Sequence, residues 1–284
     1  MDYELVNETV NLNPDVFKAV KTRLQKNHGQ LLCLTSMPNM RNFLQANDIE
    51  GTTLIDHITG RTYDPASYRY FNEVNIPAMD YVQMQKDGSI FVDDQGIFIA
   101  REYLFPNTRR ATQDIRYLNP DGSLDYVEEY VSDGKVYSHL YYSDGQLQEI
   151  EFVNMEGQPV IRYFYYDGAL NFVTVENPAT HEVTNRYNNL VDFYVDQISK
   201  MMRPQDTVSI NYLGVDLFAL RDAKSTNKYY LAEDPVDDTG KLRGNLDGIL
   251  ANRIPYVAEV HVTKPAYEKL KGFDVPLDKV RVSE

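Results

Sequence analysis

A regular series of turn glycines in the middle of the chain constrains the fold more than any other feature of the sequence. They are Gly122, Gly134, Gly145, Gly157 and Gly168, so the successive steps are 12, 11, 12 and 11 residues. Asp-Gly flanked by β-forming residues is typical of a hairpin, because glycine accepts the positive φ of a primed turn. Such a step leaves about eight residues for a strand and three or four for a turn. The spacing therefore predicts an antiparallel β-meander.

The strands of this meander are not cleanly amphipathic. In residues 124–131, one face carries Leu124, Tyr126, Glu128 and Tyr130, and the other mixes acids with valines. A strand packed against a core alternates apolar and polar residues. Regular spacing alone also permits a closed barrel or a sandwich. The mixed faces instead favour an open sheet that is wetted on both sides or covered only by a partner.

Tyrosine is unusually frequent, with 22 residues in a chain that has no tryptophan. Tyrosine combines a large contact area with a polar tip and is enriched at binding surfaces. One hypothesis is that the meander presents its tyrosines to a partner or an acceptor polypeptide. The other is that the tyrosines are simply good β-formers. The candidates for partner or acceptor binding are Tyr126, Tyr130, Tyr137, Tyr141, Tyr163 and Tyr165.

The segments on both sides of the meander alternate between helical and strand-like patterns. Residues 14–28 open with a proline and carry apolar residues at helical spacing, and Gly29 marks the expected stop. The apolar run 30–36 is typical of a buried parallel strand. Further helices are expected at 39–47, 188–202, 246–253 and 265–273, and further strands at 51–58, 207–214, 215–221, 227–234, 255–263 and 279–284.

This order of elements predicts an α/β fold with a large inserted antiparallel β-meander. We expect residues 1–63 and 179–284 to form one Rossmann-like layer and residues 64–178 to form the extended meander. The chain stops on an expected strand, which indicates either a truncated chain or a shortened paralogue.

Composition excludes several classes of function. Acidic residues outnumber basic ones by 42 to 28, giving a net charge of −14, whereas a nucleic-acid binder needs a basic face. No apolar stretch approaches the length of a membrane span, and the N-terminus lacks the pattern of a secretory signal. Cys33 is the single cysteine, so no intrachain disulfide can form and a reducing, cytoplasmic setting is expected.

The sequence carries no motif for catalysis, metal binding or a cofactor. Residues 239–248 are glycine-bearing but lack the spacing of a phosphate-binding loop. The five histidines are scattered, and His57 is interpreted as a surface or turn residue. Cys33 is expected to be a small buried hydrophobe. Neighbouring carboxylates such as Glu149 and Glu151 are expected to be solvated. We therefore predict no catalytic residue, no metal site and no cofactor.

The layout resembles bacterial glycosyltransferases with two Rossmann domains (the GT-B type). The likeness extends to the teichoic-acid glycosyltransferases and to the paired A and B subunits that O-glycosylate serine-rich adhesins for the accessory Sec pathway, and is closer to the non-catalytic B subunit. The segments that carry it are 69–81, 87–97, 115–130, 138–146, 228–250 and 260–270.

The resemblance implies a stabilising, chaperone-like subunit rather than an enzyme. The B subunit supports a catalytic A subunit, which transfers N-acetylglucosamine from UDP-GlcNAc to serine and threonine, and the extended sheets of both are implicated in pairing and in holding the acceptor. Here the donor-binding domain and the early glycine-rich loop are missing, and residues 228–235 read KYYLAEDP where active relatives carry a histidine. The chain is therefore not expected to transfer sugar alone.

The expected partners are a catalytic glycosyltransferase subunit and a serine-rich acceptor polypeptide, with no nucleic acid. The expected location is the cytoplasm, with contact to the membrane face only through partners. Two alternatives remain open. The chain could be the acceptor-side domain of an active teichoic-acid or protein glycosyltransferase, cut before its donor domain, or an unrelated β-meander interaction scaffold.

Overall fold

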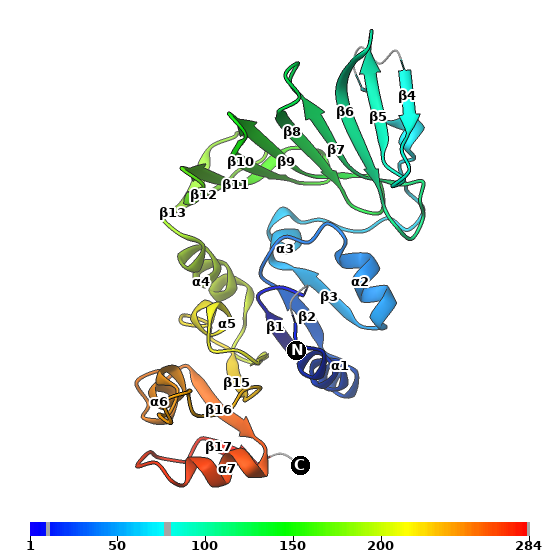
Figure 1. The fold of residues 1–284 in the computed structure, drawn as a ribbon. Coiled ribbons are helices and arrows are strands. Elements are labelled where there is room, and N and C mark those ends of the chain that lie inside the picture. Colours follow the sequence, from blue (N-terminus) through cyan, green and yellow to red (C-terminus); the bar gives the residue numbers. More distant parts are fainter. Residues whose placement is uncertain (10–11, 77–80, 283–284) are drawn as a thin grey trace. The chain divides into compact units, whose positions relative to one another are not determined.

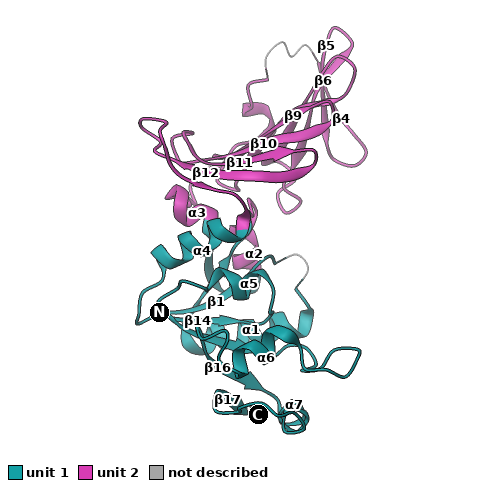
Figure 2. Ribbon diagram, turned by 90° about the vertical axis from the view of Figure 1, so that its left-hand side faces the viewer, with its two compact units in different colours: residues 1–36, 47–54, 191–284 teal, residues 37–46, 55–190 magenta. Residues whose placement is uncertain are grey.

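The computed structural model describes residues 1–9, 12–76 and 81–282 of the chain. These residues form two compact units, which are coloured separately in Figure 2. One unit comprises residues 1–36, 47–54 and 191–284, and the other comprises residues 37–46 and 55–190. The domains expected from the sequence, residues 1–63 with 179–284 and residues 64–178, stay a prediction.

The first unit is built on a parallel sheet of seven strands. Its strands are β1 (Asp2–Val6), β2 (Gln30–Cys33), β3 (Glu50–Thr53), β14 (Thr207–Ile210), β15 (Thr226–Tyr230), β16 (Val257–Val262) and β17 (Val280–Val282). Their order in the sheet is β17-β16-β15-β14-β1-β2-β3, and every neighbouring pair is parallel. The strand order therefore reverses between β1 and β14, which is the topological switch point of an open α/β sheet.

The helices of the α/β segments are α1 (Pro14–Asn27), α2 (Met40–Asn47), α3 (Leu54–Thr59), α4 (Leu190–Met201), α5 (Val215–Ala219), α6 (Gly244–Leu250) and α7 (Lys264–Leu270). Helix α1 begins where the side chain of Asn13 accepts a hydrogen bond from the Asp15 N–H, at 2.9 Å. It ends at His28, which adopts the left-handed conformation. Gly29 then permits a close approach, because a Cβ there would lie 2.8 Å from the carbonyl oxygen of Asp2.

The strand expected at 51–58 is right only in its first residues, and the strand expected at 215–221 is wrong. Strand β3 ends at Thr53, and the residues that follow form α3 (Leu54–Thr59), in which the Thr59 hydroxyl donates to the carbonyl oxygen of Ile55. Residues 215–219 form α5, with Leu217 and Ala219 buried. In both places a short apolar run fits either a strand or a buried helical turn, and periodicity cannot separate them.

The second unit contains the predicted meander, as an antiparallel sheet of ten strands (Figure 1). Its strands are β4 (Tyr81–Met84), β5 (Ile90–Asp94), β6 (Ile97–Leu104), β7 (Thr112–Leu118), β8 (Leu124–Tyr130), β9 (Val136–Ser143), β10 (Gln146–Val153), β11 (Pro159–Tyr166), β12 (Ala169–Glu176) and β13 (Val183–Tyr187). A short 3₁₀ helix, η1 (Phe71–Glu73), precedes them. Each strand pairs with the next along the chain, and β4 and β13 lie at opposite edges. The meander and its open form are confirmed.

The turn glycines divide into two kinds. At Asp144–Gly145 and Asp167–Gly168 both residues have positive φ, as the predicted primed turn requires. At Gly122, only the glycine has positive φ, and its N–H donates to the carbonyl oxygen of Asn119 at 2.8 Å, so this turn is longer and unprimed.

The sheet buries opposite faces at its two ends. Near β5–β7, the core contains Val92, Ala100 and Ile115, covered by Val74 and Ile76. Near β10–β12, the buried residues lie on the other face. They include Phe152, Ile161, Tyr163 and Val173. A twisted sheet of this width rotates its faces from one edge to the other. The mixed strand faces therefore reflect a core that changes sides, and the interpretation that both faces are wetted along the whole sheet is wrong.

No helix in the described ranges is both long and apolar enough to cross a membrane.

Candidate partner-binding face

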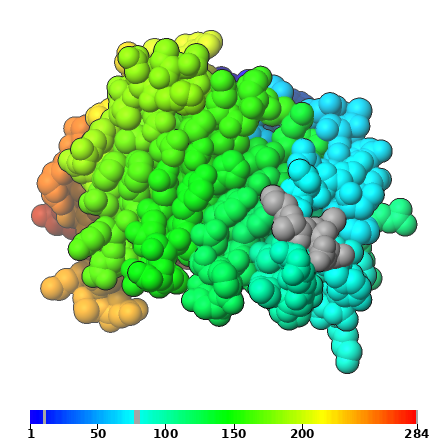
Figure 3. Space-filling view, turned by 90° about the horizontal axis from the view of Figure 1, so that it is seen from above, coloured from blue at the N-terminus to red at the C-terminus, as the bar shows by residue number. Residues whose placement is uncertain are grey.

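Two parallel rows of side chains run across the face of the sheet that is half-exposed over β8–β12. The cross-strand registers that define them link residues on one face of neighbouring strands. The aromatic row consists of Tyr117, Tyr126, Tyr141, Phe164 and Phe172, with Glu149 between Tyr141 and Phe164. The charged row consists of Glu128, His139, Glu151 and Arg162, followed by Thr174. The strands that carry both rows form one continuous surface in Figure 3.

The rings of the aromatic row are stacked across the strands. The centroids of Tyr117 and Tyr126 are 4.3 Å apart with planes inclined by 8°, and those of Tyr126 and Tyr141 are 6.1 Å apart. Phe164 and Phe172 are stacked at 4.4 Å. The stacking fixes the rings before any partner arrives, so binding there costs little side-chain entropy.

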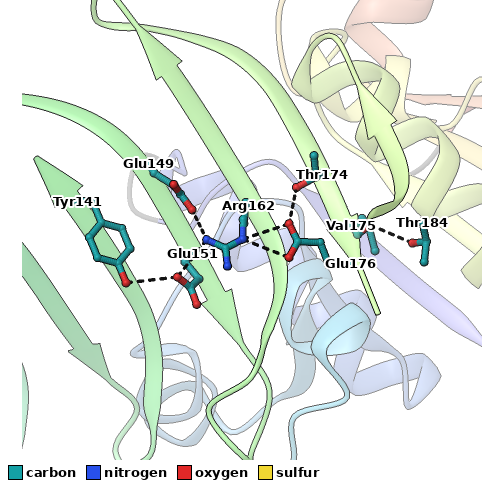
Figure 4. Close-up of polar contacts among 8 residues, drawn as sticks. All are labelled: Tyr141, Glu149, Glu151, Arg162, Thr174, Val175, Glu176 and Thr184. Atoms are coloured by element: carbon teal, nitrogen blue, oxygen red, sulfur yellow. Dashed lines mark hydrogen bonds and ion pairs between the residues drawn. The ribbon is translucent and has the colours of Figure 1, made fainter. Parts of the chain in front are cut away.

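An acidic cluster centred on Arg162 lies beside the aromatic row (Figure 4). The guanidinium pairs with Glu149, with Glu151 at 3.3 Å and with Glu176 at 3.1 Å. Thr174 donates its hydroxyl hydrogen to Glu176 at 3.1 Å. One guanidinium thus faces three carboxylates, so the cluster keeps an excess of negative charge.

Tyr141 joins the two rows. Its hydroxyl donates to Glu151 at 3.3 Å, and its side chain is 39% exposed. Burial, followed by the negative charge of Glu151, raises the pKa of Tyr141 to about 12. The phenol therefore stays protonated and keeps donating across the neutral range. The face combines ring surfaces with carboxylate acceptors, which suits the binding of hydroxyl- and amide-bearing chains rather than catalysis.

The structure separates the six predicted tyrosines into two groups. Tyr126 and Tyr141 lie together on the aromatic row, where Tyr126 is half-buried, and Tyr165 is half-buried on β11. A role of these three in partner binding stays a prediction.

The other three tyrosines are buried, so the expectation that they are presented at the surface is wrong. The Tyr130 hydroxyl donates to Glu128, and the Arg69 guanidinium lies 5.3 Å from its ring centre. The Tyr137 hydroxyl accepts from the backbone N–H of Met37 at 3.3 Å. Tyr163 packs edge-on against Phe152 at 5.1 Å. Each of these rings contributes to the core because its end of the sheet is covered on that side.

Sequence reasoning missed most of this face. No sequence motif points to Phe164, Phe172 or Arg162, and the expectation that Glu149 and Glu151 are merely solvated is wrong, because both pair with Arg162. A turn sets the register beside it, but the pairing shifts by one residue between Phe152 and Val153 and again between Phe164 and Tyr165, so the turns alone do not give these partners.

A second candidate site lies at the carboxyl edge of the parallel sheet, at the switch point. A cavity of about 250 Å³ is lined there by Asn7, Tyr212, Gly214 and Asp216, among others. Asp216 is only 3% exposed, and burial raises its pKa to about 7 against a hydrogen bond from the backbone of Asn7. Ligands of open α/β sheets bind at this kind of position.

Two further residues singled out from the sequence are Cys33, whose thiol donates to the carbonyl oxygen of Asn7 at 3.5 Å, and His57. Cys33 is buried at the end of β2, and burial raises its pKa to about 11, so its thiol is not poised as a nucleophile. His57 is exposed on α3, and desolvation lowers its pKa.

Comparisons with known proteins identify the fold. No family model matches the chain, and no curated protein matches it. Solved structures do match. The pneumococcal O-GlcNAc transferase GtfA, solved with UDP and GlcNAc, has a TM-score of 0.78 at 14% identity, over 99% of this chain and 59% of that one.

Two complexes match as well. A chain of a GtfA/B complex has a TM-score of 0.75 at 12% identity, over 98% of this chain and 58% of that one. A chain of accessory secretory protein 1, 2 and 3 from Streptococcus pneumoniae has a TM-score of 0.74 at 15% identity, over 96% and 59%. At such identities the likeness shows the fold alone. The resemblance inferred from the sequence is confirmed at that level, and the chain spans less than two thirds of the length of these structures.

Proposed function

We propose that this chain is a non-catalytic, stabilising and acceptor-binding subunit of a protein O-glycosyltransferase complex. In this proposal a partner subunit transfers GlcNAc from UDP-GlcNAc to serine and threonine of a serine-rich polypeptide. The chain corresponds to the first Rossmann-like layer of a GT-B glycosyltransferase with its extended sheet, residues 64–178, as a separate domain. The complex acts in the cytoplasm.

The observation that carries the proposal is the half-exposed face with its aromatic row and acidic cluster. Pre-stacked rings offer flat apolar surfaces to a peptide or to the C–H face of a sugar. The carboxylates of the cluster accept hydrogen bonds from serine hydroxyls and backbone N–H groups. The fold likeness to an O-GlcNAc transferase, to a chain of a GtfA/B complex and to a chain of an accessory secretory protein complex supports the same proposal.

The proposal is tested with a synthetic serine-rich peptide, offered unmodified and carrying GlcNAc, and with the candidate catalytic subunit in a co-elution assay. Tyr141→Ala should weaken peptide binding about tenfold or more, since it removes a ring and a hydroxyl from the centre of the face. Tyr166→Ala is the matched control, because Tyr166 is 77% exposed at the end of β11 and off the aromatic row.

If both variants bind the peptide as tightly as the unaltered chain, this face does not bind the acceptor. If the chain does not co-elute with the catalytic subunit at micromolar concentration, it is not a subunit of that complex.

A second candidate function is the acceptor-side domain of an active glycosyltransferase. The observation that favours it is the buried carboxyl of Asp216 in the switch-point cavity, where a group titrating near neutral pH could take part in proton transfer. The test measures sugar transfer by the chain mixed with the catalytic subunit. Loss of transfer in Asp216→Asn, without loss of co-elution, distinguishes this function from the first.

A further inference from the structure

The two edges of the ten-stranded sheet differ in how they are protected. Strand β4, at one edge, reads Tyr-Val-Gln-Met and carries no charge and no proline. Its side chains are strongly exposed, with Tyr81 at 60%, Val82 at 47% and Met84 at 59%. An exposed, uncharged edge strand is a template for pairing with another strand.

Strand β13, at the other edge, carries a charged residue, unlike β4. Arg186 lies on it, with its guanidinium 4.3 Å from the ring centre of Phe172. The hydroxyl of Thr184 donates to the carbonyl oxygen of Val175 at 2.9 Å. A charge on an edge strand opposes edge-to-edge association. The contrast singles out β4.

The hydrogen-bond phase of β4 shows which backbone groups point outward. The N–H of Gln85 donates to the carbonyl oxygen of Ser89 at 2.7 Å, so Gln85 points toward β5. Hydrogen-bonded and non-hydrogen-bonded pairs alternate along an antiparallel ladder. In the observed register, Gln83 and Phe91 therefore form a hydrogen-bonded pair, whereas the pairs Val82 with Val92 and Met84 with Ile90 are not hydrogen-bonded. The N–H and C=O groups of Val82 and Met84 therefore face the free edge.

These outward groups are symmetric about Gln83. A two-fold axis normal to the sheet at Gln83 brings Val82 of one copy opposite Met84 of the other, with their side chains on the same face. Each such pair exchanges two hydrogen bonds, so the two symmetry-related pairs give four. Val82 then packs against Met84, and no like charges on the strand oppose each other.

We propose that the free edge of β4 pairs with β4 of a second copy of this chain, which joins two ten-stranded sheets into one. The inference does not rest on the proposed function. A strand of four residues buries little area, so the dimer is weak and depends on concentration. Exposed Ile97 and Phe98, in the adjacent hairpin, enlarge the apolar surface near the junction.

The first test measures self-association of the full chain by sedimentation over a range of loading concentrations. Met84→Pro removes an outward N–H that β5 does not use, and proline is tolerated where the N–H of an edge strand faces solvent. We expect Met84→Pro to raise the dimer dissociation constant at least about tenfold, because two symmetry-related hydrogen bonds are lost. Met84→Thr, which keeps the N–H, should change it by less than about threefold.

The second test uses charge. Val82→Lys and Met84→Glu should each weaken self-association, whereas an equimolar mixture of the two variants should restore it, because the introduced lysine of one copy lies opposite the introduced glutamate of the other. Far-UV circular dichroism confirms that each variant is folded. A chain that stays monomeric at every concentration overturns the proposal. A dimer that Met84→Pro leaves unchanged, or a mixture no better than its components, overturns it as well.

Discussion

Replacement of Arg162 by glutamine gives the sharpest test of how the half-exposed face is held together. The change keeps a hydrogen-bonding side chain but removes the positive charge that contacts Glu149, Glu151 and Glu176. Removing one partner of a fully buried ion pair costs about 3–5 kcal/mol. The Arg162 side chain is 25% exposed, so solvent screens part of the loss. We expect Arg162→Gln to lower the free energy of unfolding by about 2–3 kcal/mol at pH 7.

Urea unfolding followed by far-UV circular dichroism measures this loss. Arg186→Gln is the control, because it removes a cation–π contact with Phe172 worth about 0.5–1 kcal/mol but touches none of the three carboxylates. In a double-mutant cycle, Glu151→Gln should offset part of the cost of Arg162→Gln, since it relieves the repulsion that the lost charge leaves behind. A loss in Arg162→Gln no larger than that in Arg186→Gln would refute the view that the cluster depends on its single guanidinium.

Two further predictions concern stability. Gly134→Ala should lower the free energy of unfolding in urea by about 2 kcal/mol or more, because the new Cβ would lie 2.4 Å from the backbone nitrogen of Arg69. Gly145→Ala should lower it by only about 1 kcal/mol, since Gly145 also has positive φ but no neighbour within 4 Å. Equal losses in the two variants would contradict the close approach at Gly134. The pKa of Asp216 is raised from 3.8 to about 7 in the folded chain, so its burial destabilises the fold increasingly as pH rises through that interval. At 1.36 kcal/mol per pH unit, the loss of folding free energy caused by the buried charge is at most about 4 kcal/mol. Asp216→Asn should therefore raise the free energy of unfolding by about 2–4 kcal/mol at pH 8 and change it little at pH 4. A gain that does not depend on pH would exclude titration of Asp216 as its cause.

The sequence predicts the meander well because its signal is local. Each turn glycine specifies a hairpin, and consecutive hairpins specify the strand order without any long-range information. The burial of Tyr130, Tyr137 and Tyr163 could not be predicted in the same way. Alternation tells which residues share a face, but it does not tell which end of a twisted sheet is covered on that face.

The same limit applies to the candidate site. Arg162 and Glu149 lie 13 residues apart and meet only because β10 and β11 pair in one register. The sequence pattern does not distinguish α3 and α5 from strands, because short buried runs such as Leu54–Ile55 are too short to show a period. Asp216 is unremarkable in the sequence, and its shifted pKa arises entirely from burial at the switch point.

Every strand of the ten-stranded sheet pairs only with its neighbours along the chain, and this has a kinetic consequence. The loops that must close between partners are short, so loop-closure entropy is low and folding can start at any of several hairpins and extend in both directions. Such an array behaves like a one-dimensional chain of coupled repeats. A local lesion should therefore unravel the sheet from the nearer end inward, and amide hydrogen exchange should become slower from the rim strands toward β8 and β9.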